Sequence, residues 1–406
     1  MPEPKVRFMK DDGSRYPAWK EYSISDLFTK IGNKNKDGQN TNVITNSAEF
    51  GLIPQRDYFD KDIAVEGNTG NYTIIQTGDF VYNPRKSSYA PMGPFNCYRL
   101  EEDGIVSPLY SCLRPKGVLN PEYLLWYFHT DKWYGYVNDH GAQNGARHDR
   151  VGMTDKILMG IPVTAPCEEE QQKIADFMST VDEVITTSEE EVANLETQKK
   201  AVMKKIFSQE VRFKRTDGND FPEWEEKTIG EIGDVITGST PSTKDDDNYG
   251  QDYCFCAPGD LGNGKYVVNT EKKVSEKGFK SGRAIPCGSV LATCIGSTIG
   301  KMGIAGCDMI TNQQINSIIV KDDDSEYIYY AIAYCFPQYL SSVGKQAVPI
   351  LSKSEFSKKS FPLPCLDEQR LIADFLSDFD EAIAAEKKEL ELWKELKKGL
   401  LQQMFV

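Results

Sequence analysis

The sequence predicts a mixed α/β protein built as an internal repeat, in which two globular domains are each followed by one long helix. Three observations predict this fold class: a turn motif that occurs twice, a helix-entry motif that occurs twice, and two long segments with heptad-like apolar spacing. At 406 residues the chain is long enough for two or three domains. The predicted order is a domain at 1–165, a helix at 166–208, a domain at 209–364 and a helix at 365–406.

The first motif begins each half of the chain. Residues 6–19 and 211–224 are identical at seven of fourteen positions, at a constant offset of 205 residues. Each copy holds an Asp-Gly pair, which is typical of a turn, and then a Pro and a Trp two residues apart that suit an apolar plug. The repeated pattern therefore indicates an equivalent entry into each domain.

The second motif marks the start of each long helix. Residues 170–177 and 368–375 are identical at six of eight positions, now at an offset of 198 residues. Prolines close the extended segment before each copy, and a cluster of acidic residues follows, where a helix N-terminus favours negative charge. The two halves thus differ in length but share both ends.

The segments after these entries read as two long helices of equal length. Neither contains a proline, and their apolar residues recur at intervals of three and four. A helix of ~40 residues is roughly 60 Å long, which is more than a globular domain requires. We expect the two to pack as an antiparallel coiled-coil spacer. The residues expected on the spacer and partner surface are Ile174, Phe177, Val181, Ile372, Phe375, Phe379 and Trp393.

The two globular domains carry both strand-like and helix-like runs. Residues 72–76, 288–293 and 315–320 have the composition of strands, and residues 122–128 and 326–336 have that of helices. This mixture predicts α/β domains.

Charge and composition limit the compartment and the partners. The net charge is −14, which alone disfavours nucleic acid, but residues 168–207 and 366–406 carry −5 and −4 of it. Elsewhere basic stretches remain, such as residues 83–99, which hold Arg85, Lys86 and Arg99 and no acidic residue. The sequence shows neither a membrane span nor a signal peptide, and its ten cysteines lack metal-type spacing. We therefore expect a cytoplasmic protein with reduced thiols and no metal site.

No catalytic constellation emerges from the sequence. The segment at 296–301 imitates a phosphate-binding loop, but its first glycine is one residue too close and Met302 replaces the Ser or Thr that would hold magnesium. Asp260, Glu271 and Lys273 imitate a nuclease pattern at a spacing that chance also produces. We expect no catalytic residue and no cofactor on this chain.

What remains are polar loops that carry amide, hydroxyl and cationic side chains. Arginine suits the two acceptors of guanine, Asn and Gln suit adenine, and Ser, Thr and Lys can anchor phosphates. The candidate DNA-binding residues are Arg85, Lys86, Ser87, Ser88, Tyr89, Asn144 and Arg147 in the first domain, and Ser297, Thr298, Lys301, Gln313, Lys345 and Gln346 in the second. Taken singly, each such loop could equally be a solvated turn.

With these features the chain resembles the specificity subunit of type I restriction-modification systems over nearly its whole length. The resemblance rests on the doubled helix entry, in which proline is followed by Glu-Gln and Ile-Ala-Asp-Phe, and on the glycine-rich loop at 296–301. The first domain lacks a clear copy of that loop and offers residues 83–86 near its place. The halves would then read different sequences.

The resemblance implies two target recognition domains on a helical spacer, each reading half of a split double-stranded DNA site. It further implies two methyltransferase subunits that bind S-adenosylmethionine and modify adenine, and restriction subunits that use ATP and Mg. This chain would bind none of these cofactors and would not be an enzyme.

Two other classes stay open at this point. A nuclease would need Asp260, Glu271 and Lys273 to meet in space, and a cleavage assay of the chain alone tests it. A coiled-coil scaffold that does not touch DNA is tested by a gel shift with and without the methyltransferase.

Overall fold

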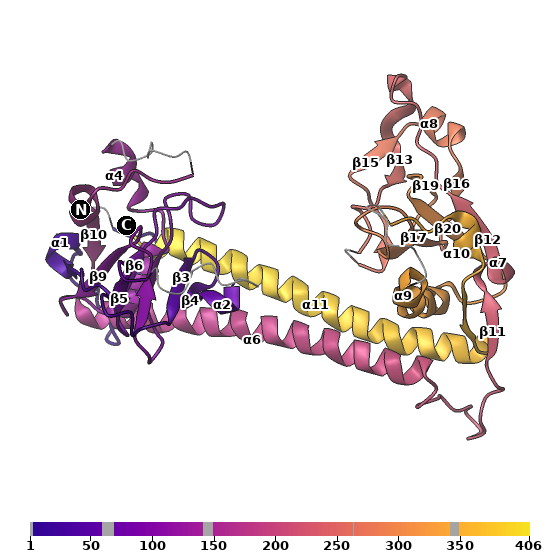
Figure 1. Ribbon diagram of the computed structural model, residues 1–406, viewed down its shortest axis with the longest axis horizontal. Coiled ribbons are helices and arrows are strands. Elements are labelled where there is room, and N and C mark those ends of the chain that lie inside the picture. Colours follow the sequence, from indigo (N-terminus) through magenta and orange to yellow (C-terminus); the bar gives the residue numbers. More distant parts are fainter. Residues whose placement is uncertain (1–2, 59–68, 141–148, 263, 342–348) are drawn as a thin grey trace. The chain divides into compact units, whose positions relative to one another are not determined.

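The computed structural model describes residues 3–58, 69–140, 149–262, 264–341 and 349–406 (Figure 1). The chain forms two compact units. Unit 1 is Met1–Thr187 with Leu390–Val406, and unit 2 is Ser188–Glu389. The long helices α6 (Glu168–Phe207) and α11 (Leu366–Met404) each contribute a part to both units. The predicted domain boundaries follow the chain, whereas the compact units divide both helices, so those boundaries stay a prediction.

Unit 1 contains two four-stranded sheets and a two-stranded ribbon. The first sheet has the antiparallel order β2-β9-β6-β7, and the second has the order β4-β3-β8-β5, in which β3 and β8 run parallel. Its strands are β1 (Lys20–Ser23), β2 (Phe28–Lys30), β3 (Val43–Ser47), β4 (Gly51–Pro54), β5 (Thr73–Ile75), β6 (Phe80–Tyr82), β7 (Phe95–Cys97), β8 (Gly104–Val106), β9 (Ser111–Pro115) and β10 (Pro162–Ala165). Its shorter helices are α1 (Ile24–Leu27), α2 (Gln55–Tyr58), α3 (Pro121–Phe128), α4 (Tyr134–Asp139) and α5 (Asp155–Gly160).

Unit 2 repeats this plan with one more strand. Its sheets have the orders β12-β20-β17-β18-β14 and β15-β13-β19-β16, and β13 pairs parallel to β19 as β3 does to β8. Its strands are β11 (Glu225–Thr228), β12 (Gly233–Thr237), β13 (Tyr249–Cys256), β14 (Tyr266–Val267), β15 (Lys272–Val274), β16 (Ala284–Ile285), β17 (Val290–Thr293), β18 (Met302–Ala305), β19 (Met309–Thr311), β20 (Ile315–Val320) and β21 (Ser360–Leu363). Its shorter helices are α7 (Ile229–Ile232), η1 (Asp246–Asn248), α8 (Glu276–Ser281), α9 (Ser325–Ser341) and α10 (Lys353–Ser357).

The same local signals start equivalent elements in both units. A capping box opens α1, where Ser23 pairs with Asp26, and another opens α7, where Thr228 pairs with Glu231. In α3 the Asn120 side chain accepts from two backbone amides of the first turn, and proline follows at the first helical position. The mixed α/β class and the internal repeat predicted from the sequence are confirmed.

Each unit has a core rich in aromatic residues between its first sheet and one helix, which is α3 in unit 1 and α9 in unit 2. In unit 1 the rings of Phe95 (β7) and Phe128 (α3) stack at a centroid distance of 4.0 Å, and Phe28 and Phe80 pack beside them. In unit 2 the buried face of α9, including Tyr327 and Ile328, packs against strands β17 and β18. A single apolar face thus attaches each helix to its sheet.

The predicted antiparallel pairing of the long helices is confirmed within each unit. In unit 1, Val181 and Ile185 of α6 pack with Leu390 and Trp393 of α11. In unit 2, Glu196 of α6 binds Lys387 of α11 at 2.6 Å, and Lys199 binds Asp380 at 2.5 Å. Contacts move backward along α11 as they move forward along α6, which defines an antiparallel pair.

Two residues of the predicted apolar stripe, Phe177 and Phe375, contact aromatic rings outside the long helices. Phe177 and Phe375 keep 38% and 37% of their surface exposed. Their rings pack on Phe8 and Phe213 at centroid distances of 5.7 and 5.6 Å. These two partners belong to the repeated segments 6–19 and 211–224, which we call the arms. The contact leaves part of each ring exposed, and the expected place of these residues on the spacer and partner surface stays a prediction.

Ile174, Val181 and Ile372 are buried, whereas Phe379 and Trp393 are half-buried. Across the described residues, none of the helices combines the length and the apolar character that a bilayer crossing requires.

Candidate nucleic-acid interface

The predicted reading loops occupy equivalent places in the two units. The first lies between β6 and β7, and the second lies between β17 and β18, the matching strands of the matching sheet. Each loop is paired by one β-bridge to a segment that follows the domain helix: Arg85 to Arg150 in unit 1, and Ile295 to Ile350 in unit 2. Residues 83–86 thus stand where unit 2 has its glycine-rich loop, as the sequence predicted.

In unit 1 the loop borders a cleft of about 670 Å³. Five predicted residues line it, namely Arg85, Lys86, Ser87, Ser88 and Tyr89. Tyr89 keeps 72% of its surface exposed, which is unusual for an aromatic residue in a loop that is otherwise well anchored. Residues of strand β3, of helix α2 and of the segment 107–110 also line the cleft, as does Arg150.

Backbone hydrogen bonds hold this loop on both sides. Lys86 N donates to Asp149 O at 2.9 Å, and Val151 N donates to Pro84 O at 2.8 Å. At the far end Gly93 has a φ of +83°, and a Cβ atom there would lie 2.1 Å from the carbonyl oxygen of Asn83. Only glycine fits this close approach without displacing the backbone.

A chain of buried amides lies beneath the loop. The Asn96 side-chain amide donates to Asn46 Oδ1 at 2.7 Å, and Asn46 donates to Val81 O at 2.7 Å. Asn83 donates to Asn46 O at 3.0 Å and accepts from Arg85 N at 3.0 Å. These amides are satisfied inside the domain, so they position the loop rather than read a ligand.

In unit 2 the predicted residues are less concentrated. Ser297 and Lys301 are exposed on the β17–β18 loop, and Thr298 is half-buried. Gln313 is exposed at the neighbouring β19–β20 turn, where its side-chain oxygen accepts from Thr240. The structure therefore brings the unit 2 candidates to adjacent turns, with one of them partly engaged by its own domain.

Four predicted residues, Asn144, Arg147, Lys345 and Gln346, lie outside the described residues. Arg150, by contrast, lines the cleft and was missed. Its pairing with Arg85 joins segments 65 positions apart, and no local motif signals such a contact.

The Glu-Gln pair of the helix entry has a structural role in both units. The buried carboxylate of Glu170 accepts from Arg7 Nε at 2.9 Å, and that of Glu368 accepts from Arg212 Nε at 3.2 Å. Each hydrogen bond raises the pKa of its arginine, so both guanidinium groups are charged at neutral pH. Each arginine also donates to a proline carbonyl of its own arm, at Pro17 or Pro222.

The glutamine that follows holds the globular domain. Gln171 accepts from Asn120 N at 2.8 Å, at the start of α3, and Gln369 accepts from Asp324 N at 2.9 Å, at the start of α9. The Glu-Gln pair therefore attaches both the arm and the domain helix to the long helix. An identical motif that makes identical contacts accounts for the repeat seen in the sequence.

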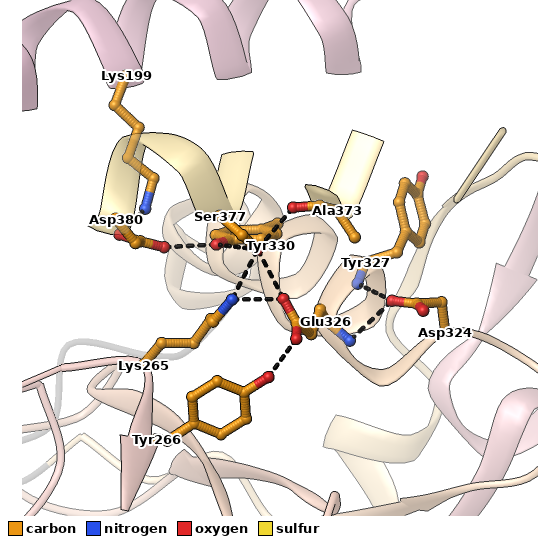
Figure 2. Close-up of polar contacts among 10 residues, drawn as sticks. All are labelled: Lys199, Lys265, Tyr266, Asp324, Glu326, Tyr327, Tyr330, Ala373, Ser377 and Asp380. Atoms are coloured by element: carbon orange, nitrogen blue, oxygen red, sulfur yellow. Dashed lines mark hydrogen bonds and ion pairs between the residues drawn. The ribbon is translucent and has the colours of Figure 1, made fainter. Parts of the chain in front are cut away.

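A second polar cluster joins each domain helix to both long helices. In unit 2, shown in Figure 2, Lys265 binds Glu326 of α9 and lies 2.7 Å from Ser377 Oγ of α11. Tyr330 of α9 donates to Asp380, which also binds Lys199 of α6. Burial raises the pKa of Tyr330, and its hydrogen bond to Asp380 raises it further, so this phenol keeps its proton.

Unit 1 has a matching but smaller cluster. Arg99 binds Glu122 of α3, and Lys397 of α11 binds Asp182 of α6. The Lys397 ammonium lies 5.0 Å from the ring centroid of Trp126, as Lys199 lies 4.8 Å from that of Tyr330. Both clusters fix the domain helix on the helix pair.

One residue of the nuclease pattern, Asp260, has backbone partners in a turn. Asp260 accepts from the backbone amides of Ala257 and Glu271, at 2.8 and 2.9 Å, and so serves as a turn cap. Among the residues that the structure covers, no group of three or more His, Cys, Asp or Glu side chains could hold a metal ion.

Comparisons with known proteins agree with this picture. The family model described as "Type I restriction modification DNA specificity domain" matches residues 17–197 and again 222–393. The chain is 36% identical over 208 residues to the type I restriction enzyme MjaIX specificity subunit of Methanocaldococcus jannaschii, covering 49% of this chain and 48% of that protein. It thus spans about half the length of that relative.

Two further relatives extend the comparison. The putative type I restriction enzyme MjaX specificity subunit of the same organism is 26% identical over 306 residues, 71% of this chain and 68% of that protein. The crystal structure of a type I restriction-modification S subunit from M. genitalium superposes with a TM-score of 0.56 at 13% identity, covering 100% of this chain and 99% of that one. The latter shares the fold. The two family matches cover most of the sequence, one in each half, and the chain therefore belongs to the type I restriction-modification DNA specificity family, with two copies of its domain.

Proposed function

We propose that this chain selects the DNA sequence for a type I restriction-modification complex and that it reads a two-part double-stranded site, one half with each unit. Adenine methylation and ATP-dependent cleavage then belong to partner subunits. S-adenosylmethionine, ATP and Mg bind those partners, and this chain is not itself an enzyme.

One observation carries the proposal. The two units share their sheet topology and their contacts to the long helices. They differ at the loop between β6 and β7 and the matching loop between β17 and β18. The Arg7–Glu170 and Arg212–Glu368 pairs are repeated, whereas the paired residues at the loops are Arg85 with Arg150 in one unit and isoleucines in the other. A duplicated frame with unlike loops is what reading two unlike half-sites requires.

The exposed phenylalanines support the docking of two copies of one partner. Phe177 with Phe8, and Phe375 with Phe213, form the same exposed aromatic pair in each unit. Beside Phe375 lies an apolar cavity of about 260 Å³ lined also by Val202, Ile206 and Val211. Because exposed apolar surface marks interaction sites, we assign one methyltransferase subunit to each pair.

The helices supply the spacing between the half-sites. On the antiparallel register that the Lys199–Asp380 and Glu196–Lys387 pairs bracket, residues 188–194 of α6 match residues 386–392 of α11. Deleting both stretches removes seven residues, or two turns, from each helix and keeps the apolar stripe in phase. At 1.5 Å per residue this shortens each helix by roughly 10 Å, about three base pairs of B-DNA.

Sequencing of methylated adenines in cells that express the complex tests the proposal. The double deletion should shorten the gap within the methylated motif and leave both half-sequences as they were. A control variant with alanine at the exposed positions of the same stretches keeps the helix length and should keep the gap. An unchanged gap in the deletion variant, with methylation retained, contradicts the spacer.

A further inference from the structure

Arg85 and Arg150 form a pair of cationic side chains on one face of the unit 1 cleft. They are direct partners in an antiparallel β-bridge, and both line the cleft. Residues that face each other in such a bridge project from the same side, with Cβ atoms about 5 Å apart. The two guanidinium groups therefore enter the cleft together.

These two arginines differ from the other arginines that the structure describes. Arg7, Arg99, Arg114 and Arg212 bind carboxylates that are wholly or partly buried, and Arg283 donates to Thr237 O. The remaining ones also have partners: Arg15, Arg56, Arg215 and Arg370. Within the described residues, neither the Arg85 nor the Arg150 guanidinium has an ion-pair or hydrogen-bond partner, so both are available to a ligand.

The loop that carries Arg85 is held in place before any ligand arrives. Asn83 caps the Arg85 amide, Gly93 closes on the Asn83 carbonyl, and Asn46 and Asn96 satisfy the groups beneath. An arginine guanidinium is planar and carries five N–H donors. When its backbone is already fixed, it loses little conformational entropy on binding two acceptors. This geometry suits recognition of a base more than a loose contact to phosphate.

We propose that Arg85 and Arg150 read guanine in the half-site of unit 1. The ligand is the major-groove edge of a G·C pair, whose O6 and N7 acceptors match a guanidinium fork. The inference deepens the proposed function and rests on it. It assigns Arg150 as a specificity residue and predicts at least one guanine in this half-site. Unit 2 has Ile295 and Ile350 at the matching positions, so its half-site is read by other groups.

Methylome sequencing of the assembled complex with Arg150→Lys, Arg150→Ala and the matching changes at Arg85 tests this assignment. Lysine keeps the charge but lacks the two-pronged donor, so it preserves a phosphate contact and loses a guanine contact. We expect both the lysine and the alanine variants to lose discrimination at one guanine of one half-site by roughly 10- to 100-fold. The other half-site should be unaffected.

The control is Ile350→Ala, at the matching place in unit 2, which should leave the guanine requirement unchanged. Discrimination retained in both lysine variants, or a two-part motif whose unit 1 half lacks guanine, would overturn the assignment and leave the proposed function standing. A wild-type complex that methylates no two-part motif would instead overturn the proposed function. Melting temperatures equal to wild type show that the exposed substitutions do not act by unfolding.

Discussion

Units 1 and 2 make the same contacts to the long helices but differ at the loop between β6 and β7 and the matching loop between β17 and β18. The Arg–Glu pair, the glutamine contact and the lysine over an aromatic ring occur in both, at positions related by the internal repeat. The buried amides under the unit 1 loop have no such match, because Asn96 of β7 corresponds to Gly303 of β18. The contacts to the long helices are thus repeated in both units, whereas the loops and the residues beneath them differ.

In each unit the arm donates a backbone hydrogen bond to the end of a long helix, but the two arms are connected to those helices differently. In unit 2 the arm continues from α6, and Val211 N donates to Lys205 O at 3.2 Å. In unit 1 the arm meets the end of α11, and Val6 N donates to Gln403 O at 3.0 Å, although these residues lie far apart in the sequence. The contact therefore depends on the helix surface and not on chain continuity.

The largest expected effect comes from breaking the Arg–Glu pair. Glu170→Ala and Glu368→Ala each leave a half-buried arginine without its carboxylate, and we expect each to lower the free energy of unfolding by about 3 to 5 kcal/mol. Glu368 also accepts from Trp224 Nε1 at 2.9 Å, so its loss should cost more. Chemical denaturation of both variants measures the difference, and equal losses would contradict the ranking.

The loops should differ in their tolerance of a methyl group. In Gly93→Ala the new Cβ meets a backbone carbonyl, whereas in Gly300→Ala it meets the Phe336 ring at 3.3 Å, which can shift. Both glycines have positive φ, which costs alanine about 1 to 2 kcal/mol. We expect a loss of about 3 kcal/mol for Gly93→Ala and about half that for Gly300→Ala in thermal unfolding. A larger loss of stability for Gly300→Ala would show that the unit 1 loop accommodates an added Cβ atom better than the unit 2 loop does.

The two tryptophans of the repeat offer a sharper comparison. Trp224→Phe removes the hydrogen bond to Glu368 and should cost about 1 to 3 kcal/mol. Trp19 occupies the matching position of the repeat and is buried, but its Nε1 lacks a hydrogen-bond partner in the structure as described, so Trp19→Phe removes no hydrogen bond and should cost less than Trp224→Phe. Melting temperatures of the two variants check this, and a comparable drop in both would contradict it.

The smallest expected effect concerns the polar cluster. Ser377 Oγ lies between Lys265 and Glu326, and Ser377→Ala should cost about 1 kcal/mol, because the Lys265 side chain is nearly buried. Ser179 occupies the matching position of α6, where its hydroxyl has no such contact among the residues that the structure describes, and Ser179→Ala should stay within about 0.5 kcal/mol of wild type. Thermal unfolding of both gives the test, and a larger loss for Ser179→Ala would mean that the clusters are equivalent.

These comparisons also show what the sequence could predict. The repeat, the α/β class and the two long helices follow from identities and apolar spacing, and each has a local cause in the structure. The Glu-Gln motif was visible as a repeat, although its contacts to Arg7 and Asn120 join segments far apart in the chain.

Tertiary pairing accounts for what sequence reasoning missed. Arg150 becomes a candidate only through its bridge to Arg85, and the amide chain joins residues from three different strands and loops. The packing of Phe177 and Phe375 on the arms was not predicted, because it joins segments far apart in the chain. Their role in partner docking stays a prediction.

Exchange of residues 220–360 with the corresponding segment of a relative that has a different methylated motif tests the two-reader account most directly. Methylome sequencing of cells carrying the exchanged subunit should show one half of the motif replaced and the other half, with the gap, retained. If both halves change, or neither does, the two units do not read independently, and the account is contradicted.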